Sequence, residues 1–243
     1  MKIIGCAGRD DVAIVYLAEI ADGKYVEFVE SVQPPIPREN KWVLIVSTSL
    51  GCPVGCIMCD AGGWYKGPLS KDEILAQIDY LIKKRYPTGN VPVKKFKIQF
   101  ARMGEPSFNE NVLAVLEEIP SLYNAPGIMP CISTIAPKGC ERFFERLLEI
   151  KNEYYFNGRF QMQFSIHTTD HDLRDRIIPI KKWDFDEIAE YCEVFYQRGD
   201  RKITLNFAPA SEWPIDAGTL LEHFDPDKFL IKLTPLNPTV SVI

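Results

Sequence analysis

The stretch WVLIVSTSLGCPVGCIMC, residues 42–59, joins two features that decide the fold. Its first part is an apolar run rich in β-branched residues, which predicts a buried strand. Its second part carries Cys52, Cys56 and Cys59 in a C-x3-C-x2-C spacing. Three cysteines placed so closely after a buried strand indicate a ligand loop rather than a chance grouping.

The spacing favours an iron–sulfur cluster over the other uses of cysteine. A structural zinc site needs a second ligand pair, and the next cysteine or histidine, Cys131, has no partner nearby. Seven cysteines are an odd number, and no signal peptide precedes them, so a secreted disulfide framework is not expected. The cysteine spacings of ferredoxins, C-x2-C-x2-C or C-x4-C-x2-C with a further cysteine, do not match this loop. We expect Cys52, Cys56 and Cys59 to hold a [4Fe-4S] cluster with one iron left without a protein ligand.

Strands and helices alternate from residue 41 onward. Ser70 with Glu73 predicts a capping box before the first helix. Alternation of this kind implies parallel strands with right-handed crossovers, so we expect an α/β fold with a partial TIM barrel, (β/α)6. The expected strands are 42–49, 95–101, 127–134, 160–166, 202–208 and 228–234, and the expected helices are 71–86, 111–119, 140–150, 185–197 and 217–223.

The first forty residues follow a different pattern. Two alternating apolar runs, 13–20 and 24–32, flank Asp22-Gly23, which is a strong hairpin signal. The proline-rich segment 34–40 then breaks the chain. We therefore expect residues 1–40 to be an N-terminal β-hairpin extension with a linker, and residues 41–243 to form the core domain.

Composition limits the compartment and the partners. No run of 18 apolar residues is present, so no membrane span is expected, and a reducing cytoplasm suits the cysteines. The formal net charge of −5 argues against broad binding to nucleic acid. A local basic patch at Lys94, Lys95 and Lys97 stays open, although lysines that flank a strand are more often interpreted as a solvated edge.

The loops after the other strands carry further motifs. They are RMGEPSFN (102–109), CISTIAPKG (131–139), FSIHTTDHDLRDRIIPI (164–180) and LTPLNP (233–238). In order and spacing these loops and the cysteine loop resemble the radical S-adenosylmethionine (SAM) superfamily. The core is most similar to the RlmN/Cfr-type adenosine methyl synthases, which methylate ribosomal and transfer RNA. The resemblance covers residues 46–238, and its specific motifs are the cysteine loop and SIH…RDRIIPI.

The resemblance implies a set of SAM-binding residues. A carboxylate accepts a strong, charge-assisted hydrogen bond from an amine, which suits Glu105 to the SAM amino group. An asparagine amide both donates and accepts, which suits Asn237 to the adenosine. Each residue also has an ordinary reading, since Ser133 can bond its own backbone and Asn237 can form a plain turn. The implied contacts are Met58, Gly104, Glu105, Pro106, Ser133, Ser165, His167 and Asn237.

The chain departs from the methyl synthases at three points. The family carries a cysteine seven residues before the first cluster cysteine, and here that residue is Ile45. A second cysteine lies beyond the last strand in the family, and a helical RNA-binding domain precedes its core; the sequence given contains neither. These departures remove methyl transfer and RNA docking while keeping the SAM-cleaving core.

The resemblance therefore implies an enzyme that reductively cleaves SAM at a [4Fe-4S] cluster and gives a 5′-deoxyadenosyl radical that acts on an unidentified substrate. Its cofactors are the cluster and SAM, and its expected electron donor is a flavodoxin or ferredoxin. Two alternatives stay open. One is an RNA-modifying methyltransferase of the RlmN/Cfr type, with RNA as a less favoured partner. The other is a non-catalytic iron–sulfur sensor or binding module.

Overall fold

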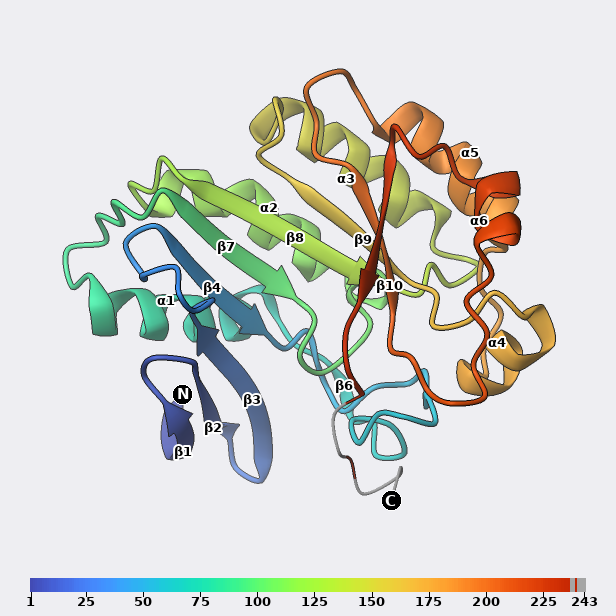
Figure 1. The fold of residues 1–243 in the computed structure, drawn as a ribbon. Helices are drawn as coiled ribbons and strands as arrows, with labels where there is room; N and C mark the ends of the chain where they lie inside the picture. Colours follow the sequence, from blue (N-terminus) through green and yellow to red (C-terminus); the bar gives the residue numbers. More distant parts are fainter. Residues whose placement is uncertain (237–238, 240–243) are drawn as a thin grey trace.

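The computed structural model describes residues 1–236 and 239, and a single curved sheet organises them (Figure 1). Nine strands lie in the order β1-β2-β3-β4-β7-β8-β9-β10-β11 among the described residues. Strands β4 to β11 of this sheet run parallel, which confirms the predicted partial TIM barrel. Their bounds are β4 Lys41–Val46, β7 Lys95–Phe100, β8 Ile128–Thr134, β9 Gln161–Ser165, β10 Ile203–Phe207 and β11 Phe229–Leu233.

The helices cover the outer face of the sheet, while the inner face stays open (Figure 1). Five of them match the predicted helices, with α2 and α3 extending further than expected. Their bounds are α1 Lys71–Arg85, α2 Asn111–Leu122, α3 Glu141–Tyr154, α5 Phe185–Phe195 and α6 Ala217–His223. The predicted capping box is present, since Glu73 N donates to Ser70 Oγ at 3.2 Å and Ser70 N donates to Glu73 Oε2 at 2.8 Å.

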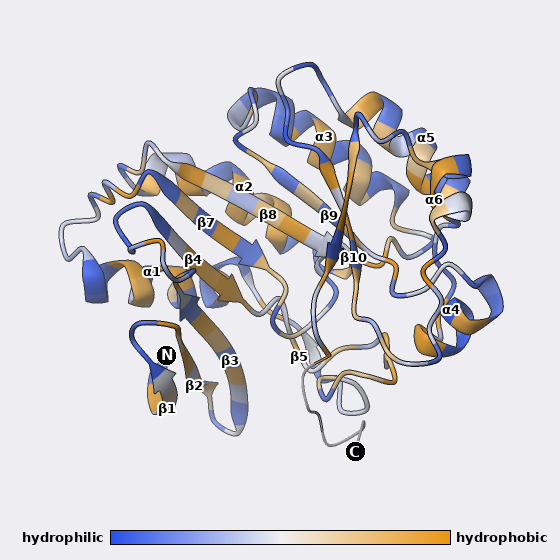
Figure 2. Ribbon diagram, in the orientation of Figure 1, coloured by the Kyte–Doolittle hydropathy of each residue, from blue (hydrophilic) through white to orange (hydrophobic). Residues whose placement is uncertain are grey.

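The core lies between the strands and these helices. Along β4 and β7, every second residue is buried: Trp42, Leu44 and Val46 alternate with half-buried neighbours, as do Phe96, Ile98 and Phe100 (Figure 2). Side chains alternate across a strand, so this set faces the helices and the other set faces the inside of the open barrel. Pro130 is tolerated in β8 because pairing with β9 begins one residue later, at Cys131.

The N-terminal hairpin is confirmed, and it carries one additional strand. β2 (Ala13–Ala21) and β3 (Lys24–Ser31) pair antiparallel across Asp22-Gly23. β1 (Lys2–Arg9) adds to β2, and β3 pairs antiparallel with β4, so this three-stranded meander continues the barrel sheet. The sequence does not predict β1 because Gly5 and Gly8 interrupt any alternation in it. A domain division at residue 40 stays a prediction.

A further helix, α4 (His171–Ile177), lies in the loop after β9. The Asp175 carboxylate of this helix pairs with Lys182 Nζ at 2.5 Å. Arg174 is buried inside this loop and donates from Nη1 to the Trp183 carbonyl oxygen at 2.7 Å. Among the described residues, no helix is long and apolar enough to cross a membrane.

Candidate functional site

Two short strands close the loop that carries the three cysteines. β5 (Ser49–Leu50) pairs antiparallel with β6 (Gly67–Pro68), so residues 51–66 leave and return at one point. Within the loop Cys59 N donates to the Cys56 carbonyl oxygen at 3.1 Å. A Cβ on Gly62 would lie 2.9 Å from Gly55 Cα, so this close crossing requires glycine. The loop lies at the carboxyl ends of the parallel strands (Figure 1), where barrel folds place their chemistry.

The loop rests on apolar side chains from the loops after β8 and β9. Val54, Ile135, Ile177 and Ile178 form a buried cluster, against which Cys52, Cys56 and Met58 pack. Ile57 N also donates to the Ile177 carbonyl oxygen at 3.1 Å. The motif RDRIIPI therefore has a structural reason, because its first two isoleucines, Ile177 and Ile178, keep water away from one side of the cysteine loop.

The three thiols are close enough to influence one another electrostatically. The pKa of Cys52 is raised to about 11, mainly by burial and also by the nearby Glu105 and Cys59, while a backbone hydrogen bond from Val54 opposes the rise. Burial raises the pKa of Cys56 to about 12, with Cys59 and Cys52 as the next causes. Both thiols are thus protonated at neutral pH, and iron binding would replace their protons.

This donor set fits a cubane iron–sulfur cluster. In the part of the chain that the structure describes, no three histidine, cysteine or acidic side chains converge on one point, as the ligands of a single ion would. A cubane makes a different demand, because each thiolate binds its own iron. Cys52, Cys56 and Cys59 are all free, all partly buried and all on one short loop, which meets that demand.

A cavity of about 920 Å³ lies beside the cysteine loop. Met58, Cys59, Ser133 and His167 line it, so four of the predicted cluster and SAM residues meet there. The meander forms one wall and the end of β11 with the following loop forms another. Further lining residues are Leu17, Tyr25, Glu27, Ile45, Trp64, Gln99, Arg102, Met103, Asn206, Lys232, Thr234 and Thr239.

His167 is held in an unusual backbone conformation at the cavity wall. Its φ is +68°, and its Nδ1 accepts a hydrogen bond from Ala208 N at 3.2 Å. Burial, together with the smaller effect of the Arg174 charge, lowers the pKa of His167 to about 4. The ring is therefore neutral at pH 7 with its proton on Nε2, which is free to donate to a ligand.

The Gly-Glu-Pro turn supports the site from below the cavity surface. Glu105 is buried, and its Oε1 accepts from Ser107 N, Ser107 Oγ and Thr134 Oγ1, at 3.1, 2.8 and 2.5 Å. Its Oε2 accepts from Ile135 N at 3.0 Å. Burial raises the pKa of Glu105, although these hydrogen bonds oppose the rise. The carboxylate thus joins the ends of β7 and β8.

Four of the other predicted SAM residues, Gly104, Glu105, Pro106 and Ser165, fall outside the cavity lining. Gly104 packs against the chain after β4, Pro106 begins a short 3-10 helix, Pro106–Phe108, and Ser165 ends β9. Asn237 lies outside the described residues. The contacts of all eight predicted residues with SAM, and of the three cysteines with a cluster, stay predictions.

Sequence reasoning missed several residues of the cavity wall. Gln99 and Asn206 are polar residues flanked by buried apolar neighbours on their strands, and this alternation was the available signal for an inward-facing position. Leu17, Tyr25 and Glu27 come from the meander, and no sequence pattern places them beside the cysteine loop.

Comparison with known proteins agrees with this geometry. The chain is 30% identical over 238 residues to a probable dual-specificity RNA methyltransferase RlmN from Desulfitobacterium hafniense (strain Y51), with 93% of this chain and 62% of that protein covered. It is 27% identical to the corresponding protein of Trichormus variabilis, with 96% and 61% covered. The chain thus spans about three fifths of the length of these curated relatives. No protein-family model matches.

A solved structure shares the fold. A radical SAM methyltransferase from Sphaerobacter thermophilus superposes with a TM-score of 0.78 at 21% identity, covering 98% of this chain and 68% of that one. The shared fold, the sequence relatives and the cysteine loop at the strand ends agree with one another. The chain is thus similar in sequence to proteins named as RlmN-type RNA methyltransferases, and it shares the fold of a radical SAM methyltransferase.

Proposed function

We propose that this chain is a radical SAM enzyme whose substrate enters the open barrel. The observation that carries the proposal is the cavity of about 920 Å³, which has the cysteine loop at one side and Ser133 and His167 at another. Cys52, Cys56 and Cys59 would hold a [4Fe-4S] cluster. Bound there, the cluster supplies one electron to the sulfonium of SAM, whose cleavage yields a 5′-deoxyadenosyl radical.

The chain's own residues would bind and orient SAM. The neutral His167 presents an Nε2 proton to the cavity, and Ser133 offers a hydroxyl that both donates and accepts. Met58 supplies an apolar surface beside Cys59. Ile135, Ile177 and Ile178 exclude water from the other side of the loop, which favours chemistry in a dry site.

RNA methylation is a second candidate, because the curated relatives are named as RNA methyltransferases. Ile45 lines the cavity at the position where the resembling methyl synthases carry a cysteine. An isoleucine side chain cannot act as nucleophile, acid or base. We therefore favour a different outcome of the radical step, and methyl transfer from labelled SAM to RNA would revive the second candidate.

Anaerobic reconstitution tests the leading proposal. Iron and sulfide restore the cluster, and dithionite replaces the natural electron donor, for which a flavodoxin or ferredoxin is proposed. We expect 5′-deoxyadenosine to form from SAM and to be measurable by chromatography. An intact cluster without 5′-deoxyadenosine would contradict the proposal and favour a sensor or binding module.

A cysteine variant tests the ligand assignment. Cys56→Ser removes one of three thiolates, and we expect reconstituted protein to lose most of its iron and its iron–sulfur absorbance. Cys6→Ser is the matched control, because Cys6 is exposed on β1 and lies outside the loop. Equal iron content in both variants would show that the ligand assignment is wrong.

A further inference from the structure

The inner face of the barrel carries a group of positive charges that the proposed reaction does not use. Trp42 and Leu44 of β4 face the helices, so Lys41 belongs to the alternate set that faces inward. On β7, Lys95 and Lys97 alternate with the buried Phe96 and face the same way. Both are half-buried, so their interpretation as a solvated edge is wrong.

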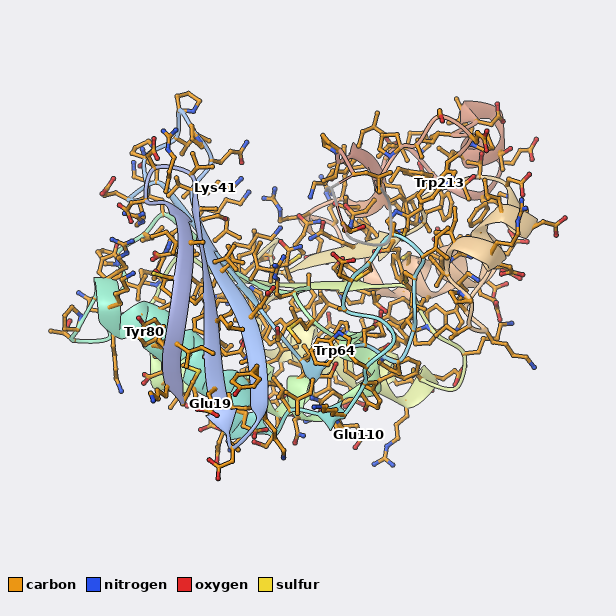
Figure 3. The ribbon with its side chains drawn as sticks, turned by 90° about the horizontal axis from the view of Figure 1, so that it is seen from below. Glu19, Lys41, Trp64, Tyr80, Glu110 and Trp213 are labelled. Carbon is orange, nitrogen blue, oxygen red and sulfur yellow. The ribbon has the colours of Figure 1, made fainter. Side chains whose placement is uncertain are left out.

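Strand pairing brings these lysines together. Lys41 is the register partner of Lys95, and Lys97 is one pleat further along β7. Lys232 on β11 pairs with Asn206, which also faces the cavity, and thus comes from the opposite side of the open barrel. In Figure 3 Lys41 lies near the top of the view, well away from Trp64 of the cysteine loop.

The charges influence one another. Burial lowers the pKa of Lys41, and the remaining causes are the cations Lys97, Arg201 and Lys232. Burial lowers the pKa of Lys95 to about 8, with Arg201, Lys41 and Lys97 as the next causes. We call Lys41, Lys95, Lys97, Arg201 and Lys232 the inner cationic group.

The side chains that contact the inner cationic group are neutral, whereas clustered lysines usually pair with carboxylates. Among the residues that the structure describes, none of its five members forms an ion pair with a carboxylate. Arg201 Nε donates to Gln161 Oε1 at 3.0 Å, and Lys41 Nζ donates to Gln33. The Cys131 thiol on β8 is buried, and burial raises its pKa, so the thiol stays neutral.

The group is continuous with the candidate active site. Lys232, a member of the group, lines the cavity. Gln99 also lines the cavity, and it lies two residues after Lys97 on the same face of β7. From Lys97 to Ala101, another lining residue, the chain advances four residues, which is about 13 Å at the rise of a strand. An elongated ligand can therefore reach from the cationic group to the cavity beside the cysteine loop.

We infer that the inner cationic group binds a phosphate group of the substrate. Several cations gathered without carboxylates repel one another, and an anion of high charge relieves that repulsion. A phosphate group carries up to two charges and several acceptor oxygens, which suits converging lysine and arginine donors. The chain as a whole is acidic, with a net charge of −5, so this cationic group, in which Lys41, Lys95 and Lys97 are half-buried and Arg201 and Lys232 are exposed, is a local feature. The inference rests on the proposed function only in calling the ligand a substrate.

Binding measurements without SAM and reductant test the inference separately from SAM cleavage. Inorganic pyrophosphate represents a small phosphorylated molecule, and a short single-stranded RNA represents backbone phosphates. We expect one of the two to raise the Tm of the purified protein and to bind measurably by calorimetry. Lys95→Gln and Lys97→Gln should each weaken that binding about tenfold, the effect of one charge-assisted hydrogen bond.

A matched control separates the inner group from general charge. Lys83→Gln removes an equal charge from α1 on the outer face, where Lys83 pairs with Asp79, and should leave binding unchanged. Without ligand, the Lys95 and Lys97 variants should unfold at or above the wild-type Tm, because a repulsive charge is gone. Binding of pyrophosphate alone identifies a small phosphorylated substrate, and binding of RNA alone identifies backbone phosphates. Binding of neither probe, or equal binding by all variants, overturns the inference.

Discussion

At the scale of single residues, Glu105 shows how a motif can serve the fold beneath a site. A carboxylate has about four acceptor positions, and Glu105 receives four hydrogen bonds from Ser107, Thr134 and Ile135. These bonds fix the turn after β7 against the end of β8. Ser133, one residue before Thr134, is thereby held at the cavity wall.

Gly104 is the residue that allows this turn to lie close to the chain after β4. Its φ is +99°, and a Cβ would lie 2.9 Å from Ser49 N and overlap Ser49 Oγ. We expect Gly104→Ala to lower the free energy of unfolding by at least about 3 kcal/mol, since backbone strain and overlap add. Urea unfolding measures the change.

The matched control for Gly104 is Gly139. Gly139 has a φ of +86°, but a Cβ there meets nothing within 4 Å. Gly139→Ala should therefore cost only the conformational part, about 1 kcal/mol. Equal losses in the two variants would show that the contact with Ser49 contributes nothing.

At the scale of elements, a buried carboxylate joins α1 to the meander. Glu30 on β3 is 1% exposed. Its Oε1 accepts from Tyr16 at 2.5 Å and from Arg85 Nη2 at 2.9 Å, and its Oε2 accepts from Arg85 Nε at 2.9 Å and from Trp42 Nε1 at 3.3 Å. Burial alone would raise the pKa of Glu30, but Arg85 and Tyr16 outweigh it, so the pKa lies below its ordinary value.

Replacing this carboxylate should loosen the contact between α1 and β3. We expect Glu30→Gln to lower the free energy of unfolding by about 3 kcal/mol at neutral pH, because Arg85 loses its buried partner. The folded-state pKa is depressed, so the stabilisation is present above the unfolded pKa of about 4.3 and is lost as the pH falls through the folded value. Urea unfolding from pH 7 down to pH 3 should show the two proteins converging.

Glu193 provides the control for Glu30. It pairs with Lys228 on the surface, where its side chain is 58% exposed. Glu193→Gln should change the stability by less than about 1 kcal/mol, as exposed ion pairs do. A Glu30 variant as stable as the Glu193 variant, or a difference independent of pH, would contradict the assigned role of Glu30.

At the scale of the whole molecule, the strands of the sheet differ in how completely they are paired and buried. β8 is paired on both sides and almost fully buried, whereas β1 is paired only with β2 and is mostly exposed. We expect β1 amides to exchange with solvent at least about a hundredfold faster than β8 amides, a difference of about 2.7 kcal/mol in opening free energy. Hydrogen-exchange mass spectrometry measures it, with rates corrected for intrinsic exchange. Equal protection of β1 and β8 would show that the sheet opens only as one unit.

The sequence by itself determined the alternation of strands and helices and the position of the cysteine loop. These follow from local patterns: period-two and period-3.6 burial, the capping box at Ser70, and the spacing of Cys52, Cys56 and Cys59. Such patterns depend on near neighbours in the chain, so they are readable without a structure. His167 and Ser133 were named from the family resemblance, and both line the cavity; their contacts with SAM stay predictions.

The tertiary structure alone decided which distant residues share a space. No sequence pattern links the lysines of β4, β7 and β11, and only the pairing and curvature of the sheet bring them near one another. The hydrogen bonds from Thr134 and Ile135 to the Glu105 carboxylate depend on the same long-range strand pairing. So does the position of the meander residues that line the cavity with Met58. The physical reason is that an alternating pattern states that a strand has two faces, but not which partners each face meets.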